Sequence, residues 1–205
     1  MPTAVILLAA GSSSRLGQPK QLLAYEGKTL LRRAAETAVA AAAGVPVVVV
    51  TGALHEELLP ELAGLSVLVV RCNSWAQGMG ASLKTGLAAL ESLCNNWATV
   101  VVTLCDQPHV TAKVIEQLVT TYLHTSQPIV AAEYGGVRGV PVLFGAEVVP
   151  LLRQISDAAG AAQLLKQHPQ LVATVPFAAG AVDVDTPEQY VALLGDKTSS
   201  QSGNT

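Results

Sequence analysis

Residues 5–20 read VILLAAGSSSRLGQPK, and this stretch decides the fold class. Its apolar run ends in two alanines and gives way to a glycine, three serines and two basic residues. A buried strand that breaks into such a loop leaves backbone N–H groups without partners at its carboxyl end, and a row of these amides attracts anions. Arg15 and Lys20 add two full positive charges at the same place. The stretch therefore predicts a first core strand followed by a polyphosphate-binding loop.

An ordinary polar turn with two solvated basic residues is the alternative explanation for a loop of this composition. Pro19 argues against it, because the fixed φ of proline aims Lys20 instead of leaving it free. The spacing fits neither of two common phosphate loops. Ser13 and Leu16 occupy positions where a dinucleotide fingerprint has glycine, and the lysine is followed by glutamine where a P-loop needs serine or threonine.

Composition restricts the classes of protein. At 205 residues the chain suits one α/β domain, predicted over residues 1–196, followed by a polar, disordered tail at 197–205. The core is aliphatic, since half the residues are apolar but only 4% are aromatic. The formal net charge of −3 and the lack of a basic stripe argue against nucleic-acid binding.

The cysteines and the apolar runs indicate the cellular compartment of the protein. Cys72, Cys94 and Cys105 are too widely spaced for a metal site, and we interpret them as reduced thiols of a cytoplasmic protein. The first apolar run lacks the basic residues that precede a signal-peptide core, and the other runs are far shorter than the ~20 residues that cross a bilayer. No membrane partner is therefore expected.

Apolar runs and amphipathic segments alternate along the chain, which predicts a three-layer α/β/α sandwich around a mostly parallel, Rossmann-like sheet. The glycine-rich tip at 134–139 predicts a hairpin, so the sheet is expected to become mixed there. Strands are expected at 45–50, 66–71, 99–105, 128–133 and 171–176, and helices at 29–43, 56–62, 82–93, 111–124, 146–154, 159–167 and after Thr186.

Carboxylates follow two of the later segments. Asp106 ends the strand at 99–105, where it either caps a turn or binds a metal ion. Asp183 and Asp185 alternate on one face of a predicted strand end, and two such carboxylates repel each other unless a cation lies near them. Since carboxylates combined with phosphate oxygens suit Mg²⁺, we expect that ion at this edge of the sheet. His109 is interpreted as a solvated turn residue.

The loop at 73–82, NSWAQGMGAS, is a further candidate. A simple strand-to-helix connection explains its glycines but not its polar residues. Loops at the carboxyl edge of open α/β sheets are where ligands bind.

Six blocks together resemble one known family. LAAGSSSRLGQPK, VVVTG, NSWAQGMGASL, LCDQP, RGVPVLF and VDVDTPEQY are similar to successive blocks of the MobA-like NTP-transferase family, and within it to the molybdenum cofactor cytidylyltransferases. The resemblance implies a nucleotide-diphospho-sugar transferase-like fold and transfer of CMP from CTP to molybdopterin cofactor, with release of pyrophosphate. The related guanylyltransferases usually read LAGG where this chain has LAAG, which favours cytidine.

The resemblance also implies roles for individual residues. Arg15, Lys20 and Asp106 would be catalytic. Asp106 and either Asp185 or Asp183 would hold Mg²⁺. The nucleotide would lie against Ala10, Gly11, Ser12, Gly52, Asn73, Gly78 and Ser82. A molybdoenzyme or its chaperone would be the protein partner.

One block departs from the family pattern. Where the cytidylyltransferases often carry GDxGAR, residues 156–162 read SDAAGAA and lack the arginine. This leaves the acceptor open, and three alternatives remain: a guanylyltransferase or a transferase with another acceptor, a reductase that uses a nicotinamide nucleotide, and a non-catalytic carrier of a cofactor.

Overall fold

The structure is a computed structural model that describes residues 1–14, 16–93 and 96–201. Within these residues lies a seven-stranded sheet in the order β5-β4-β1-β6-β8-β7-β9. The first four strands are parallel, β8 runs antiparallel to β6 and β7, and β9 is parallel to β7. The strands are β1 (Thr3–Ala9), β4 (Val47–Thr51), β5 (Leu68–Arg71), β6 (Thr99–Leu104), β7 (Ile129–Tyr134), β8 (Val137–Gly145) and β9 (Val172–Pro176), with a small hairpin of β2 (Ala24–Tyr25) and β3 (Lys28–Thr29) beside the sheet.

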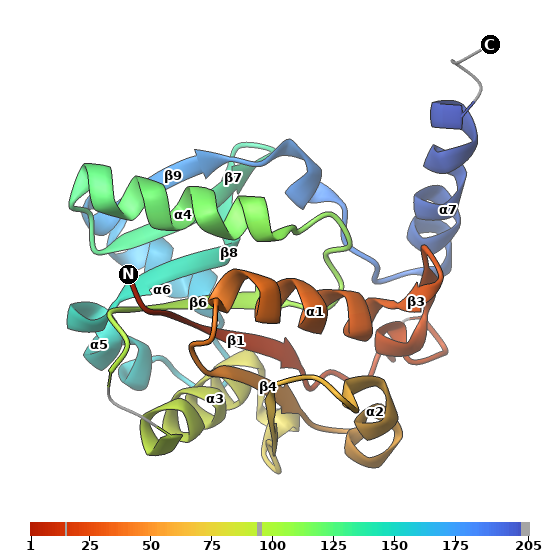
Figure 1. Ribbon diagram of the computed structural model, residues 1–205, viewed down its shortest axis with the longest axis horizontal. Helices are drawn as coiled ribbons and strands as arrows, with labels where there is room; N and C mark the ends of the chain where they lie inside the picture. Colours follow the sequence, from red (N-terminus) through yellow and green to blue (C-terminus); the bar gives the residue numbers. More distant parts are fainter. Residues whose placement is uncertain (15, 94–95, 202–205) are drawn as a thin grey trace.

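Helices cover both faces of the sheet, which makes the three layers (Figure 1). The first face carries α1 (Leu30–Ala42), α2 (His55–Leu62) and α4 (Ala112–Thr125). The second carries α3 (Met79–Leu93), α5 (Val149–Gln154) and α6 (Ala161–Gln167). Short 3₁₀ turns are η1 (Lys20–Leu22), η2 (Trp75–Gln77), η3 (Ala146–Val148), η4 (Pro169–Leu171) and η5 (Ala178–Ala181). The predicted mostly parallel α/β/α sandwich and its β7–β8 hairpin are confirmed.

Local sequence explains where the major elements begin and end. All residues of β1 and β4 are buried, as expected of aliphatic strands with helices on both faces. The side chain of Thr29 accepts a hydrogen bond from the backbone N–H of Arg32 and so caps α1. That helix ends where Ala43 and Gly44 take positive φ angles.

The segment with Asp183 and Asp185 is not a strand end, and that prediction was wrong. After η5 the chain crosses the carboxyl edge of the sheet without pairing along a strand. The backbone N–H of Val184 donates to the carbonyl oxygen of Asp106 at 3.1 Å, and the Val184 side chain is fully buried in a cluster with Leu193. The alternation of aspartate and valine arises because Val184 anchors this segment to the fold and the aspartates on either side of it stay near the surface.

The last helix, α7 (Pro187–Gln201), stands beside the sheet and not on either face (Figure 1). Its predicted capping box is confirmed: the Thr186 hydroxyl accepts from the N–H of Gln189, and the Gln189 Oε1 accepts from the N–H of Thr186. The helix includes residues 197–201. The disorder predicted for 197–205 stays a prediction, and residues 202–205 of that tail lie outside the described residues. None of the helices in the described part of the chain has the length and apolar character needed to cross a membrane.

Candidate active site

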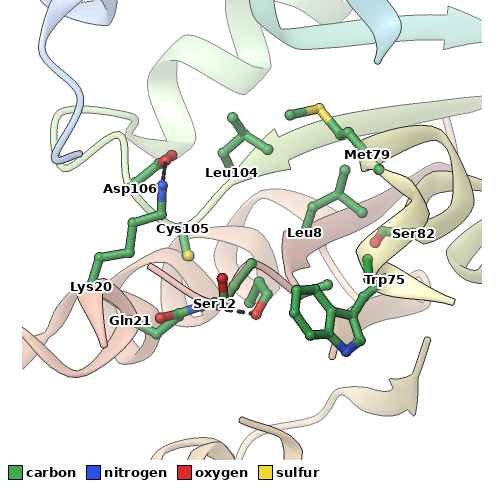
Figure 2. A pocket seen from close by; sticks show the side chains of 15 residues that line it. Leu8, Ser12, Lys20, Gln21, Trp75, Met79, Ser82, Leu104, Cys105 and Asp106 are labelled. Atoms are coloured by element: carbon green, nitrogen blue, oxygen red, sulfur yellow. Dashed lines mark hydrogen bonds and ion pairs between the residues drawn. The ribbon is translucent and has the colours of Figure 1, made fainter. Parts of the chain in front are cut away.

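A cavity of about 310 Å³ opens at the carboxyl ends of β1 and β6 (Figure 2). Its walls are the loop that follows β1, the turn that follows β6, and the segment that joins η2 to α3. The lining residues are Leu8, Ala9, Ala10, Gly11, Ser12, Lys20, Gln21, Trp75, Ala76, Gly78, Met79, Ser82, Leu104, Cys105 and Asp106. This is the edge at which open α/β sheets bind ligands.

The loop after β1 is held in shape by its own residues. The fully buried Gln21 donates from Nε2 to the carbonyl oxygens of Ala9 (3.2 Å) and Gly11 (2.7 Å). Its Oε1 accepts from the hydroxyl of Ser13 at 3.0 Å, and that hydroxyl also accepts from the backbone N–H of Lys20 at 3.0 Å. Sequence reasoning missed Gln21, because a glutamine after the lysine gives no sign that it folds back under the loop.

Lys20 joins this loop to both acidic segments. Its Nζ lies 2.5 Å from Oδ2 of Asp106 and 2.6 Å from Oδ1 of Asp185. Burial by itself would lower the pKa of the Lys20 ammonium, but the charge of Asp106 and the hydrogen bonds to both carboxylates outweigh burial and raise the pKa above its ordinary value. The structure thus brings together three predicted site residues that are far apart in the sequence.

Asp183 faces a different partner. Its Oδ1 accepts from Nε2 of Gln189 at 2.9 Å, and the Oε1 of the same glutamine accepts from the backbone N–H of Asp185 at 2.8 Å. Partial burial raises the pKa of the Asp183 carboxyl, and the charges of Asp185 and Asp106 raise it further. Asp185 is therefore the member of the pair that contacts Lys20, while Asp183 contacts the first turn of α7.

The two carboxylates around Lys20 fit a hard divalent cation. Oδ1 of Asp106 is buried and has no hydrogen-bond partner among the described residues, so it retains a free acceptor position. Mg²⁺ is commonly bound by one or two carboxylates, because it keeps several waters and takes phosphate oxygens as further ligands. The two carboxylates that converge on Lys20 match this donor set. The described residues contain no group of three or more His, Cys, Asp or Glu side chains that could hold a metal ion.

Five of the seven predicted nucleotide-binding residues line the cavity, namely Ala10, Gly11, Ser12, Gly78 and Ser82. Gly52 and Asn73 are not among the described lining residues. A Cβ atom on Gly52 would lie 2.5 Å from the carbonyl oxygen of Ala10 and 2.8 Å from the side chain of Trp75, so this glycine permits close packing beneath the loop. Asn73 is exposed to solvent. Arg15 lies outside the described residues.

The cavity also has an apolar wall, which sequence reasoning missed. Leu8, Leu104, Met79 and Trp75 surround its other end, and Figure 2 shows the Trp75 ring across the cavity from the Lys20–Asp106 pair. A cavity that is charged at one end and apolar at the other suits a ligand with a phosphate chain and a flat ring. Between the two ends, burial and the charge of Asp106 raise the pKa of the Cys105 thiol to about 12, which keeps it protonated.

The segment of residues 73–82, which we call the second loop, comprises η2 and the first residues of α3, and it rests on a distant part of the chain. A Cβ atom on Gly80 would collide with the carbonyl oxygens of residues 156 and 159, and one on Gly78 would lie 2.6 Å from the carbonyl oxygen of Asp157. The N–H of Ala81 donates to that same Asp157 carbonyl at 3.2 Å. The block that lacks the expected arginine therefore supports the second loop through its backbone. We call residues 156–159 the seat of the second loop.

Comparisons with known proteins give this chain several relatives. The chain is 33% identical over 200 residues to nicotine blue oxidoreductase of Paenarthrobacter nicotinovorans, an alignment that covers 92% of this chain and 95% of that protein. It is 24% identical over 187 residues to the molybdenum cofactor cytidylyltransferase of Escherichia coli K12, covering 91% and 92% of the two chains.

A solved relative is the manganese complex of Rv0371c from Mycobacterium tuberculosis H37Rv. It superimposes with a TM-score of 0.72 at 25% identity, over 95% of this chain and 99% of that one. The model of the MobA-like NTP transferase domain matches residues 5–172. The chain therefore belongs to the MobA-like NTP transferase domain family.

Proposed function

We propose that the protein transfers CMP from CTP to molybdopterin cofactor and releases pyrophosphate. The observation that carries this proposal is the meeting of Lys20, Asp106 and Asp185 at the charged end of a cavity whose other end is apolar. The choice of CTP is supported by the LAAG start of the first loop, with Ala10 lining the cavity, and by the cytidylyltransferase relative.

In this reaction an oxygen of the acceptor forms a bond to the α-phosphorus of CTP, and the bond from that phosphorus to the bridging oxygen of the β-phosphate breaks. Asp106 and Asp185 would hold Mg²⁺, which supplies charge neutralisation and Lewis acidity at the phosphates. The manganese-bound relative supports the use of a divalent ion.

The residues of the chain supply binding and orientation. Amides of the first loop and the ammonium of Lys20 bind the phosphate chain, and Trp75 offers an aromatic face to the ring of the ligand. When the nucleotide binds, Lys20 exchanges its present carboxylate partners for phosphate oxygens. Because the Cys105 thiol stays protonated, direct transfer to the acceptor is favoured over a covalent enzyme intermediate.

The test is pyrophosphate release from each of CTP, GTP, ATP and UTP, with Mg²⁺ and molybdopterin cofactor. Release with CTP that an Asp106→Ala variant loses supports both the reaction and the metal site. Release with GTP instead would change the assignment to a guanylyltransferase, and release with none of the four nucleotides would reject the transfer to molybdopterin. Thr99→Val serves as a control, because Thr99 lies buried at the opposite end of β6 from Asp106.

A second candidate function rests on a separate observation, the 33% identity to an oxidoreductase over nearly the whole chain. A reductase would bind a reduced nicotinamide nucleotide at the same cavity without a divalent ion. Titrating NADH and NADPH into the protein with and without EDTA distinguishes the two: metal-independent binding favours the reductase, and metal-dependent CTP binding favours the transferase. Tight cofactor binding without any turnover would instead indicate a carrier.

A further inference from the structure

A second, much smaller cavity lies directly behind the active-site edge. Its volume is about 20 Å³, and it is lined by α1, the end of β6, the turn that follows β6 and the start of α4. A cavity of this size holds about one water molecule when polar groups line it. It is separate from the proposed nucleotide cavity, although Cys105 and Leu104 contribute to both.

Three buried polar atoms among its lining residues have no hydrogen-bond partner within the described part of the chain. They are Nε of Arg33, Oγ1 of Thr103 and Oε1 of Gln107. Each such atom is costly to bury alone, because it has given up its hydrogen bonds to water. Three such atoms, all on residues that line one small cavity, point to a shared partner.

The three atoms are complementary to a single water molecule. The Arg33 Nε–H is a donor, the Gln107 Oε1 is an acceptor, and the Thr103 hydroxyl is both. One water can accept from Arg33, donate to Gln107 and bond to Thr103, which is the usual number of hydrogen bonds for a buried water. A metal ion does not fit, since the cationic side chain of Arg33 lines the cavity.

Arg33 is itself held in place from outside the cavity. Its Nη1 lies 2.7 Å from Oε2 of Glu26, and its guanidinium carbon lies 4.9 Å from the centre of the Tyr25 ring. These contacts hold the guanidinium group in place, while its Nε is buried.

The other end of the Gln107 carboxamide reaches three further elements of the chain, and its Nε2 lies 3.4 Å from the hydroxyl of Tyr134 on β7. Its Nε2 donates to the carbonyl oxygen of Val140 on β8 and to that of Gly180 in η5, each at 3.1 Å. Gln107 directly follows Asp106, and η5 leads into the segment that carries Asp185. The carboxamide therefore links the two segments whose carboxylates share Lys20.

We propose that Gln107 is a positioning residue: its buried carboxamide, completed by one water molecule bound to Arg33 and Thr103, sets the distance between the Asp106 turn and the Asp185 segment. The consequence for metal binding rests on the proposed function, whereas the water and the positioning do not. Gln107 is not among the described residues that line the nucleotide cavity; it acts through the backbone that it joins.

The first test locates the water. Crystal structures of the wild-type protein and of Thr103→Val are determined at a resolution that shows ordered waters. We expect one water within hydrogen-bond distance of Arg33, Thr103 and Gln107 in the wild type, and its loss or displacement in the variant. A cavity that is dry in the wild type would overturn the water site.

The second test measures positioning through the Val184 amide, which donates to the carbonyl oxygen of Asp106 and so reports contact between the two segments. Gln107→Met removes the hydrogen bonds at similar volume, and we expect amide hydrogen exchange at Val184 to become about tenfold faster. Thr103→Val should give a smaller increase. Unchanged exchange at Val184 in the Gln107→Met variant would overturn the positioning role.

Thr99→Val is the matched control, because Thr99 is a buried threonine on the same strand whose hydroxyl bonds to Thr3 at the far end of β6. It should lower overall stability without changing exchange at Val184. If Gln107→Met accelerates exchange throughout β1 as well, the variant is globally destabilised and the specific positioning role is rejected.

A third measurement separates this inference from the proposed function. Binding of Mn²⁺ in the presence of CTP, followed by electron paramagnetic resonance, should weaken about tenfold in Gln107→Met, while CTP binding without metal stays unchanged. Wild-type protein that binds no Mn²⁺ with CTP would reject the proposed function. The exchange result at Val184 would still decide the positioning role.

Discussion

The two loops that face each other across the cavity are built in opposite ways. The first loop, residues 10–20, takes its shape from Gln21 and Ser13, which lie within or beside it. The second, residues 73–82, takes its shape from the backbone of residues 156–159, more than seventy residues away. The phosphate end of the cavity is thus encoded locally, whereas the apolar end depends on the tertiary fold.

Because of this difference, the two loops should tolerate different kinds of substitution. A locally bonded loop should fail when its own polar side chains are removed, but it has space for added atoms. A loop seated on distant backbone should fail when atoms are added between the two surfaces, and its side chains should matter less.

The largest effect is expected from Gly80→Ala. The new Cβ would collide with carbonyl oxygens of the seat, which cannot move like the end of a flexible side chain, so we expect a loss of about 3 kcal/mol in the free energy of unfolding. Gly11→Ala is the control in the first loop, because a Cβ atom added there would have no other atom within 4 Å and the φ of Gly11 is outside the left-handed region. It should change stability by less than about 0.5 kcal/mol. Equal losses in urea denaturation would contradict the comparison.

The next effect is expected from Gln21→Leu. It leaves the buried carbonyl of Ala9 and the hydroxyl of Ser13 without the partner that they have now, so we expect a loss of about 2 kcal/mol together with weaker CTP binding. Gln163→Leu, at an exposed position of α6, should change neither quantity measurably. Full retention of CTP affinity, measured by calorimetry, would mean that the first loop does not depend on Gln21.

Lys20→Met should affect metal binding and nucleotide binding in opposite directions. The ammonium lies between the two carboxylates proposed to hold the metal, so its removal should strengthen binding of Mn²⁺ alone by about tenfold while weakening binding of CTP. Electron paramagnetic resonance measures the first quantity and calorimetry the second. Weaker binding of Mn²⁺ alone would show that Lys20 does not compete with the metal.

The smallest effect is expected from Asp157→Asn. Its side chain pairs with Lys84 across the seat of the second loop, but both side chains are about a third exposed or more, so the pair should contribute about 0.5 kcal/mol or less. The backbone carbonyl that accepts from Ala81 is retained. Thermal unfolding at low and high salt measures the difference. A loss as large as that of Gly80→Ala would show that side chains, not backbone, hold the second loop.

Features that depend on local periodicity could be predicted from the sequence. The β-branched run that forms β4, the cap at Thr29 and the capping box at Thr186 all act within a few residues, and each was found in the structure as expected. The meeting of Lys20 with Asp106 was also predictable, because β1 and β6 are parallel and end at one edge of the sheet. Asp185 reaches the same edge on a segment that is not a strand, so its contact with Lys20 was expected for the wrong reason.

Features that depend on distant partners could not be predicted. The start of α3 at Met79 instead of residue 82 follows from the seat under Gly80, which is invisible in the local sequence. The same holds for Gln107, whose partners on β8 and η5 come more than thirty residues later. The aspartate–valine alternation before α7 looks like a strand, and only the bond from Val184 to Asp106 shows that it is a crossing.

The order of the strands has one further consequence, for self-association. The sheet ends at β5 on one side and at β9 on the other. Exposed strand edges invite pairing with another molecule, but β5 has four residues and ends in Arg71, and β9 has five and ends in Pro176. A charge and a missing N–H donor at the ends of two such short strands hinder the growth of a sheet between molecules. The described strands thus protect the fold against edge-to-edge aggregation.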